Sequence, residues 1–354
     1  MARIAVHGAG AIGASVAYHL ALLGARDVVL ADRGEVAGGS TARAMGGIRQ
    51  QFSTAAEVRL AQASIRFFEQ LGPSLFQQVG YLFIASTEDG MAALESRRTL
   101  QASLGVTVER LDATRVGLFA PGVRVDDVVG GVVGLEDGVA DPAAVTRELV
   151  RRAVDLGVRV RERTPGEDVA ADVRVLACGP WSAEAAARYG VDLPVRPLCR
   201  QLFDTTSVAA LPERLPMVLE QETGFHFRRV EDRLRVAMAD PAPRWGFATD
   251  VDESLILDRL GRLQSRFPAA APARVGRAWA GLYDMTPDAH PVIGPLGDDL
   301  YVACGFSGHG FMQSPAVGRA VAEELLQLAP SIDLSPYRCD RFAASSVFPE
   351  EVVL

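Results

Sequence analysis

The sequence predicts an α/β protein with a parallel sheet, and two glycine-rich segments at opposite ends of the chain carry this prediction. The first, residues 8–13, follows an apolar run at residues 3–7, and the second, residues 305–311, follows the apolar run 300–304. Each run is typical of a buried strand, and each glycine segment precedes a helical pattern. Such turns direct backbone N–H groups and the positive end of a helix at a ligand. Two of them indicate one long ligand, a dinucleotide, held from both sides.

Bulk properties narrow the class of protein. The chain has 354 residues, enough for two domains or one large domain with an insertion. A net charge of −8 disfavours nucleic acid as a partner. No run approaches a membrane span, and no signal peptide precedes the strand that begins at residue 3. The four cysteines form no CxxC pair and no metal-ligand cluster, so we expect a cytoplasmic location and no metal.

The basic residues exclude several mechanisms. All 36 are arginine, and the chain contains neither lysine nor asparagine. A GC-rich genome explains this bias, and selection against heat-labile asparagine is the lesser alternative. Without lysine, the protein cannot use a Schiff base, a lysine general base or a P-loop lysine.

The N-terminal segment has the spacing of a dinucleotide-binding unit. A helical pattern over Ala11–Leu23 ends at Gly24, and the apolar strand Val28–Ala31 is closed by Asp32. Asp32 follows Gly13 by 19 residues, the spacing at which an acid at a strand end reaches a ribose hydroxyl. The acid disfavours a 2′-phosphate, so the pattern fits NAD or FAD better than NADP.

The next segment helps to choose between these two cofactors. Residues 38–49 are small and flexible, with the hydroxyls of Ser40 and Thr41 and the guanidiniums of Arg43 and Arg49. Such a loop can pass close under a flat ring and hydrogen-bond a pyrophosphate. An ordinary surface loop is the alternative at this point.

Five motifs resemble the FAD-dependent amine and amino-acid oxidoreductases of the D-amino-acid oxidase and sarcosine oxidase group, over nearly the whole chain. The closest likeness is to sarcosine oxidase of the β-subunit or monomeric type. The motifs are a flavin-contacting loop (39–41 and 46–49), a DGxxDP turn (137–142), an AAGxW strand end with Cys178 in place of alanine (176–182), and the C-terminal pair 285–294 and 305–312. The C-terminal pair is far more specific than the N-terminal glycine pattern.

The resemblance implies a Rossmann-like FAD-binding domain, of the glutathione-reductase-like kind, with a mixed-sheet α+β substrate domain. It implies an FAD domain of residues 1–47, 138–195 and 275–345, a substrate domain of residues 48–137 and 196–274, and a tail of residues 346–354. The periodicity of apolar residues is compatible with a substrate domain between the segments of the FAD domain. It predicts strands at 81–85, 224–228 and 233–238, and helices at 57–71, 91–103 and 255–266.

Two departures from the family predict that FAD is bound without a covalent link. Covalent sarcosine oxidases carry a cysteine where this chain has Gly281, and dimethylglycine-type enzymes carry a histidine where it has Arg43. The predicted cofactor contacts are Gly8, Gly10, Ala11, Ile12, Gly13, Asp32, Arg33, Gly39, Ser40, Thr41, Arg43, Ala44, Met45, Gly46, Gly47, Ala177, Cys178, Gly179, Trp181, Gly281, Gly305, Gly308, His309, Gly310, Phe311 and Met312.

The resemblance also implies roles at the substrate. Arg49 matches an arginine that grips the substrate carboxylate bidentately; a solvated surface arginine is the alternative. Tyr283 matches a tyrosine over the substrate; a core tyrosine is the alternative. Met312 replaces the lysine that gives a second carboxylate contact, which predicts a more apolar pocket. We interpret His309 as a neighbour of the cofactor and leave His226 without a role.

The last helix is expected to stabilise negative charge on the flavin. The sequence predicts Ser314 as its N-cap and Pro315 as its first residue, with apolar periodicity to Leu328; a helix that only packs on the sheet is the alternative. Relatives use a lysine near flavin N5 to assist oxygen, and Arg235 is the positional candidate here.

The expected reaction is hydride transfer from the carbon next to nitrogen of an amine or amino acid to flavin N5. The resulting imine hydrolyses in water. Sarcosine-like, N-alkyl, cyclic and D-amino acids are the candidate substrates. Two alternatives stay open: a non-catalytic FAD-binding assembly factor, and the catalytic subunit of a hetero-oligomeric sarcosine or proline dehydrogenase. A partner subunit or an electron acceptor other than oxygen is therefore also considered.

Overall fold

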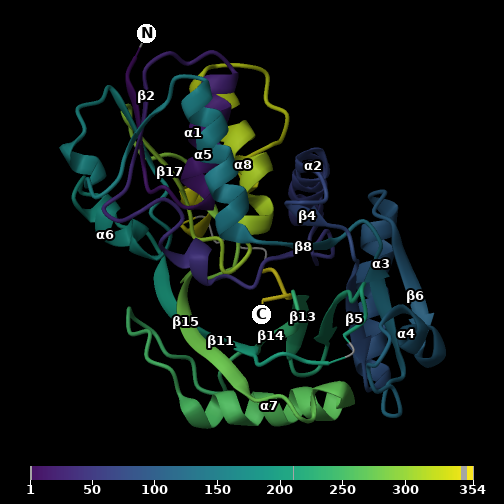
Figure 1. Ribbon diagram of the computed structural model, residues 1–354. Coiled ribbons are helices and arrows are strands. Elements are labelled where there is room, and N and C mark those ends of the chain that lie inside the picture. The colour runs from purple at the N-terminus through teal and green to yellow at the C-terminus, as the bar shows by residue number, and fades with distance from the viewer. Residues whose placement is uncertain (1, 210, 344–348, 354) are drawn as a thin grey trace.

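Two large sheets organise the chain, and each draws strands from distant parts of the sequence (Figure 1). The computed structural model describes residues 2–209, 211–343 and 349–353. Of the predicted C-terminal tail 346–354, residues 346–348 and 354 lie outside the described residues. The predicted fold class, an α/β protein with a Rossmann-like sheet and a second mixed sheet, is confirmed.

The first sheet has six strands and contains both predicted strand–glycine–helix units. All neighbours pair in parallel except β16 with β17, which are antiparallel. In spatial order the strands are β16 (Val292–Pro295), β17 (Leu300–Cys304), β10 (Val173–Leu176), β1 (Ile4–His7), β2 (Val28–Ala31) and β9 (Arg159–Arg161). The carboxyl ends of β1 and β17 therefore meet at one edge, as a shared ligand requires.

Three helices lie side by side against this sheet: α1 (Ala11–Leu22), α5 (Pro142–Asp155) and α8 (Gly310–Leu325) (Figure 1). Helix α1 is buried from Ala11 to Leu20, because α5 and α8 both pack against it. Helices α1 and α8 approach closely at Gly318, where a Cβ atom would lie 2.2 Å from Ser15 Oγ. Small residues at this crossing thus fix the position of α8 relative to α1.

The second sheet has eight strands and lies below the first in Figure 1. Its longest pair, the antiparallel strands β11 and β15, lies beneath the turns of the first sheet. In spatial order the strands are β15 (Val275–Met285), β11 (Arg196–Thr205), β14 (Arg233–Ala237), β13 (His226–Val230), β12 (Met217–Glu220), β5 (Tyr81–Ala85), β7 (Gly130–Gly134) and β6 (Val108–Asp112). Strand β15 pairs here, although the predicted boundary put residues 275–285 with the FAD domain; the domain boundaries stay a prediction.

A small third sheet and further helices complete the described fold. The sheet is β3 (Gly47–Ile48), β8 (Gly138–Ala140) and β4 (Phe76–Gln77). The helices are α2 (Ala55–Leu71), α3 (Glu88–Ser103), α4 (Ala113–Phe119), α6 (Ser182–Ala187) and α7 (Glu253–Arg266), with 3₁₀ turns η1 (Ser40–Arg43), η2 (Gly166–Asp168), η3 (Gly179–Trp181), η4 (Pro268–Ala270), η5 (Ser335–Tyr337) and η6 (Cys339–Phe342). No helix in the described part of the chain has the length and apolar character needed to cross a membrane.

The predicted start of the last helix is wrong. Helix α8 begins at Gly310 and contains Pro315 as its sixth residue, and it ends at Leu325 rather than Leu328. Pro315 has no N–H for the Phe311 carbonyl one turn earlier. The Ser314 hydroxyl donates to that carbonyl instead, at 2.9 Å. A side chain therefore replaces the missing backbone bond, which a preference for proline at helix starts could not reveal.

Buried neutral histidines make the fold sensitive to acid. His19 in α1 is buried and donates from Nδ1 to the Ser15 carbonyl at 2.8 Å. Burial lowers the pKa of His19 from 6.5 to about 4, against the smaller opposing effect of that bond. Since the folded pKa is depressed, His19 contributes its full stability above pH 6.5 and loses it as the pH falls towards 4, about 3 kcal/mol in all.

We predict that the stability advantage of the wild type over His19→Asn shrinks by about 3 kcal/mol between pH 7 and pH 4. Asparagine keeps an N–H donor and does not titrate. Thermal unfolding of both proteins at each pH, with FAD in excess, measures the difference and cancels all other titrating groups. If the stability difference between wild type and His19→Asn stays constant over this pH range, the lowered pKa of His19 is contradicted.

Candidate active site

A cavity of about 590 Å³ lies between the glycine turns of the first sheet and strands β11, β13, β14 and β15 of the second. Its size is within the usual range for ligand sites. Every residue predicted from the sequence to hold the cofactor or the substrate lines this cavity, except Gly13 and Gly305. The turns from the two ends of the chain thus meet at one cavity, while the roles of the individual residues stay a prediction.

The N-terminal turn is built by very close backbone approach. Gly8 has a φ of +103°, and a Cβ atom there would lie 2.3 Å from the Ala177 carbonyl oxygen. A Cβ atom on Gly13 would lie 1.8 Å from the Gly8 carbonyl oxygen. Gly13 therefore packs α1 against β1 and does not reach the cavity, although its position in the motif predicted a contact with the cofactor.

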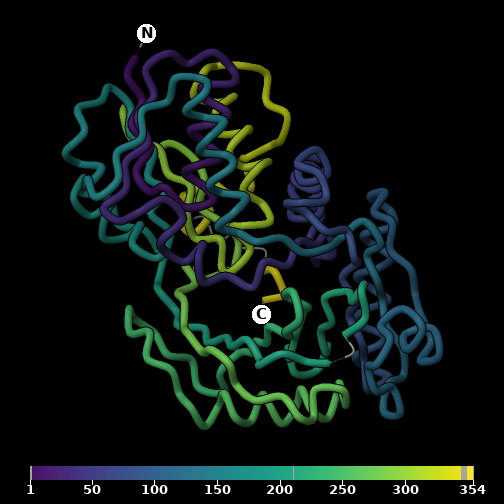
Figure 2. The backbone as a smooth tube through the Cα atoms, viewed as in Figure 1, coloured from purple at the N-terminus to yellow at the C-terminus, as the bar shows by residue number. Residues whose placement is uncertain are grey.

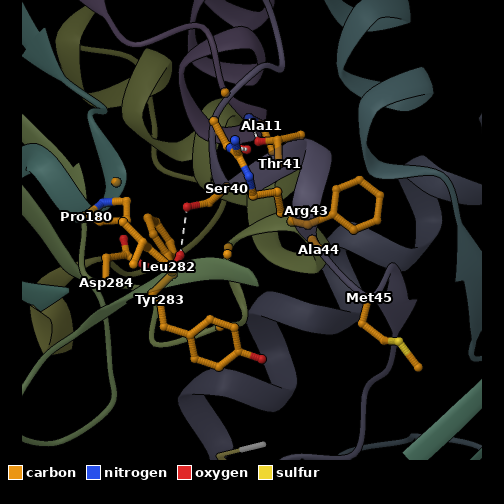
Figure 3. A pocket seen from close by; sticks show the side chains of 18 of the residues that line it. Ala11, Ser40, Thr41, Arg43, Ala44, Met45, Pro180, Leu282, Tyr283 and Asp284 are labelled. Carbon is orange, nitrogen blue, oxygen red and sulfur yellow. Dashed lines mark hydrogen bonds between the residues drawn. The ribbon is translucent and has the colours of Figure 1, made fainter. Parts of the chain in front are cut away.

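The start of α1 is prepared for a negatively charged group. Its N-cap is Gly10, which offers no side-chain cap, so N–H groups of the first turn other than that of Ala11 are available at the helix end. The loop at 38–43 lies against this end, because Thr41 Oγ1 accepts from the Ala11 N–H at 3.1 Å (Figure 3). Ser40 donates to the Leu282 carbonyl at 2.7 Å, which ties the loop to β15 (Figure 3).

Asp32 lies at the end of β2 with its carboxylate fixed by two backbone donors. Oδ2 accepts from the Ala9 N–H and Oδ1 from the Gly34 N–H, both at 2.7 Å. Each oxygen keeps a further lone pair, which suits a ribose diol. The Arg33 guanidinium lies 4.5 Å from the centre of a Trp181 ring and closes this end of the cavity.

The two positions at which relatives attach flavin covalently touch one another in this chain. A Cβ atom on Gly281 would lie 2.9 Å from Arg43 Cβ. Arg43 also donates from Nη1 to the carbonyls of Gly38 and Gly39, both at 3.1 Å, and so holds the loop in shape. A side chain at position 281 would therefore be crowded by Arg43, while non-covalent binding of FAD stays a prediction.

The C-terminal turn brings α8 to the same cavity. Gly308 has a φ of +96°, and a Cβ atom there would lie 2.4 Å from the Tyr283 ring. Gly305, at φ +74°, packs on Thr286 and shapes the turn without reaching the cavity. Helix α8 has His309 as N-cap, with no side-chain cap, so its first N–H groups lie at the cavity wall.

The other end of the cavity carries positive charge around Tyr283. The Arg200 guanidinium on β11 lies 5.3 Å from the centre of the Tyr283 ring. Burial raises the pKa of Tyr283, and the charges of Arg200 and Arg49 oppose this rise. Tyr283 is thus a neutral phenol under the influence of two guanidiniums, in a cavity wall rather than a sealed core.

Arg49 is buried, with only 1% of its surface exposed, so the alternative of a solvated surface arginine is wrong. Its guanidinium stacks 4.1 Å from the centre of the Phe52 ring. Nη1 donates to the Gln51 carbonyl, and Nη2 donates to the Val352 carbonyl at 2.8 Å. A buried arginine held by carbonyls keeps its full charge beside the cavity.

Sequence reasoning missed several lining residues, among them Tyr81, Arg200 and His226. Arg235, the positional candidate near flavin N5, pairs instead with Asp204 at 2.8 Å across the strand pair β11–β14 and does not line the cavity. Arg200 lies opposite Gly281 on β15, a pairing that only the fold shows.

His226 is a neutral acceptor at the cavity. Its Nδ1 lies 2.8 Å from the Gly224 carbonyl, which can only accept, so Nδ1 carries the proton and Nε2 carries a lone pair. Burial lowers the pKa of His226 to about 4. Its position on an alternating strand was the available signal, but burial in a core and exposure to a cavity give the same pattern.

These features fit FAD and define a flavin-binding oxidoreductase fold. The glycine cradles, the two open helix ends and the carboxylate of Asp32 match the pyrophosphate and ribose of a dinucleotide. Within the described residues, no group of three or more His, Cys, Asp or Glu side chains could hold a metal ion.

The chain belongs to the FAD dependent oxidoreductase family, whose profile matches residues 3–324. The predicted family and cofactor are thereby confirmed. FAD-dependent oxidoreductase domain-containing protein 1 of Bos taurus is 30% identical and is aligned over 99% of this chain and 87% of its own length. The 4-methylaminobutanoate oxidase (formaldehyde-forming) of Paenarthrobacter nicotinovorans is 26% identical over 96% of this chain, which spans only 46% of that relative.

Solved structures share the fold. L-proline dehydrogenase from P. horikoshii superposes with a TM-score of 0.91 at 24% identity, covering 98% of this chain and 99% of that one. Glycine oxidase from Geobacillus kaustophilus gives a TM-score of 0.86 at 22% identity, covering 96% and 98%. At these identities the likeness establishes the architecture.

We predict that Gly13→Ala abolishes FAD binding, because its Cβ atom at 1.8 Å from a backbone oxygen forces α1 away from β1. The matched control is Gly261→Ala in α7, where a Cβ atom meets open space and a gain of about 0.5–1 kcal/mol is expected. Flavin content after purification and FAD titration measure the effect. A yellow Gly13→Ala protein with wild-type affinity contradicts the role of close packing.

Proposed function

We propose that this FAD-dependent oxidoreductase oxidises an amine that carries a carboxylate, at the carbon next to nitrogen. The observation that carries the proposal is that two guanidiniums, Arg49 and Arg200, line the cavity and that both charges act on Tyr283. Relatives whose names specify amines or amino acids support it: 4-methylaminobutanoate oxidase, dimethylglycine dehydrogenase and sarcosine dehydrogenase. The chain spans less than half of each of these.

The distribution of acids in the cavity supports an anionic substrate. Its lining carboxyl groups are those of Asp32, Glu35 and Asp284. Asp32 accepts from the N-terminal turn and Glu35 pairs with exposed Arg163. Asp284 accepts from the Gly305 N–H at 2.8 Å, and burial raises its pKa to about 6. These partners occupy the acids near the turns, which leaves the arginine end suited to a carboxylate.

Bound FAD supplies the acceptor for a hydride from the substrate carbon. In our proposal Arg49 binds the substrate carboxylate and Tyr283 covers the substrate from β15. His226 offers a lone pair at Nε2 that can accept a hydrogen bond from the substrate nitrogen. The open end of α8 favours negative charge beside it. Placement by these groups contributes most of the rate, so no separate base is needed.

The apolar part of the cavity constrains the rest of the substrate. Met217, Met238, Leu202 and Met312 line it. A flexible sulfur-containing wall accepts a bulky N-alkyl or cyclic group. We therefore propose an N-alkyl, cyclic or D-amino acid as substrate, and FAD held without a covalent bond.

The proposal also covers the electron acceptor and the cellular location of the protein. The chain has no lysine, and Arg235 pairs with Asp204 away from the cavity. We propose slow reaction with oxygen and reoxidation by another acceptor or a partner subunit. Four free cysteines, two of them buried, support a reducing, cytoplasmic location.

We predict that proline and sarcosine bleach the flavin under anaerobic conditions, whereas pyrrolidine and dimethylamine, which lack the carboxylate, bleach it at least tenfold more slowly. The charge-assisted bonds of a guanidinium account for the ratio. Stopped-flow absorbance measures both rates. Equal rates for each matched pair contradict a carboxylate site, and a flavin that no amine bleaches favours a non-catalytic flavoprotein.

We predict that Arg49→Gln raises the KM of a bleaching amino acid by about 10- to 100-fold, the effect of losing a hydrogen-bonded charge. Arg49→Lys should recover part of this loss, because an ammonium keeps the charge without the bidentate geometry. Arg59→Gln on the exposed face of α2 is the control. An Arg49→Gln protein with wild-type KM would assign the carboxylate to another residue.

A further inference from the structure

The last described residues, 349–353, lie in the middle of the molecule rather than on its surface. Figure 2 shows the C-terminal end of the chain between the first sheet and the strands of the second. Glu350 and Val352 are both buried there. The Val352 carbonyl accepts from Arg49 Nη2 at 2.8 Å and lies 3.1 Å from His309 Nε2. The segment thus contacts two residues of the candidate site, Arg49, 303 residues earlier in the chain, and His309, 43 residues earlier.

Specific hydrogen bonds hold this segment in place. Both carboxylate oxygens of Glu350 accept from the Ser53 N–H at 3.1 Å, and one also accepts from the Val352 N–H at 3.0 Å. The Glu350 N–H donates to the Asp288 carbonyl at 3.1 Å, and the Glu351 N–H to Ser53 Oγ at 3.1 Å. Glu350 is therefore the anchor of the segment.

The residues that hold the C-terminal segment and Arg49 are themselves fixed by further side-chain contacts. Asp288 is buried and pairs with buried Arg341 at 2.8 Å. Gln51, whose carbonyl accepts from Arg49, donates from its own side chain to Asp137 at 3.1 Å. The two carbonyls that hold the Arg49 guanidinium thus belong to separately braced parts of the chain.

The Val352 carbonyl also contacts His309. His309 Nε2 lies 3.1 Å from this carbonyl, which can only accept, and 3.3 Å from Arg49 Nη2, which can only donate, so Nε2 serves one of these two partners in each tautomer. Burial, followed by the charge of Arg49, lowers the pKa of His309 well below its usual value, so the ring is neutral.

Several donors of Arg49 are left over. Its Nη1 and Nη2 atoms each donate to one backbone carbonyl, of Gln51 and Val352, and its plane is fixed on the Phe52 ring. Three of its five N–H groups remain beyond these two bonds, and the Tyr81 side chain is also within reach of the guanidinium. The Nε atom is buried and has no hydrogen-bond partner among the described residues. An unpaired buried N–H of a charged group is costly, unless a ligand completes it.

We infer that the C-terminal segment 349–353 is a positioning part of the substrate site. The Val352 carbonyl orients the Arg49 guanidinium so that Nε–H and the remaining Nη hydrogens bind the substrate carboxylate. This inference rests on the proposed function, since it assumes a carboxylate ligand. Val352 acts through Arg49 and does not itself touch the substrate.

The test measures binding without turnover. Anthranilate and aniline carry no hydrogen on a saturated carbon next to nitrogen, so neither can be oxidised in this way, and only anthranilate has a carboxylate. Each is titrated into the oxidised holoenzyme and followed by the flavin absorbance spectrum. Two variants loosen the segment: a chain that ends at Glu350, which lacks Val352, and Glu350→Ala, which keeps full length and loses the anchor. A chain that ends at Val353 keeps the Val352 amide carbonyl and is the control.

We expect both variants to bind anthranilate about tenfold more weakly and aniline as the wild type does, with the control unchanged. In an Arg49→Gln background, Glu350→Ala should have no further effect on anthranilate, because the segment acts through Arg49. Flavin content and thermal midpoint report whether each variant is folded.

Three results overturn the inference. One is an additive effect of the Glu350 and Arg49 substitutions, and another is an equal loss for aniline and anthranilate. The third is a wild-type protein that binds no anthranilate, since there is then no carboxylate site to complete. Failure of the proposed function appears separately, as flavin that no amine bleaches even though anthranilate binds.

Discussion

The close approach of backbone to backbone at Gly8 and Gly13 is the constraint on which the rest of the structure depends. With no Cβ atom at either residue, β1, β10 and the first turn of α1 meet within van der Waals contact. The bare end of α1 then lies at the carboxyl edge of the parallel sheet. Since α8 packs on α1 through Gly318, the same contact also places the C-terminal turn. The cavity is thus a consequence of how two helices are seated on one sheet.

The predictable part of this arrangement is local. The N-terminal unit, from β1 through α1 to Asp32, follows from spacing alone, because strand, turn, helix and acid are adjacent in the sequence. The beginning of α8 could not be predicted in this way, since the Ser314 hydroxyl replaces the bond that Pro315 cannot make. Side-chain pairing between neighbouring strands could not be predicted either, because only the fold shows that Arg235 forms an ion pair with Asp204.

The candidate site was even less predictable from local sequence than the fold. Motif resemblance identified the region of Arg49, but its partner carbonyl at Val352 lies in a tail that no motif covers. Arg200 and His226 lie on β11 and β13, where alternation predicts a buried side and cannot distinguish a cavity from a core. Sequence therefore located the cofactor end, where backbone geometry dominates. It left the substrate end open, because side chains from six strands of the second sheet, β5, β11, β12, β13, β14 and β15, line the cavity.

The charges that line the cavity differ in how they are held. Asp32, Glu35 and Asp284 each have a partner in the protein, and the guanidiniums of Arg49 and Arg200 both act on Tyr283. With arginine as the sole strong base in the chain, positive charge cannot be removed by deprotonation as it could be from a buried lysine. A permanent cation that is buried needs acceptors in every state of the protein. Backbone carbonyls such as those of Gln51 and Val352 meet this need for Arg49 without neutralising it, so its charge remains directed at a ligand.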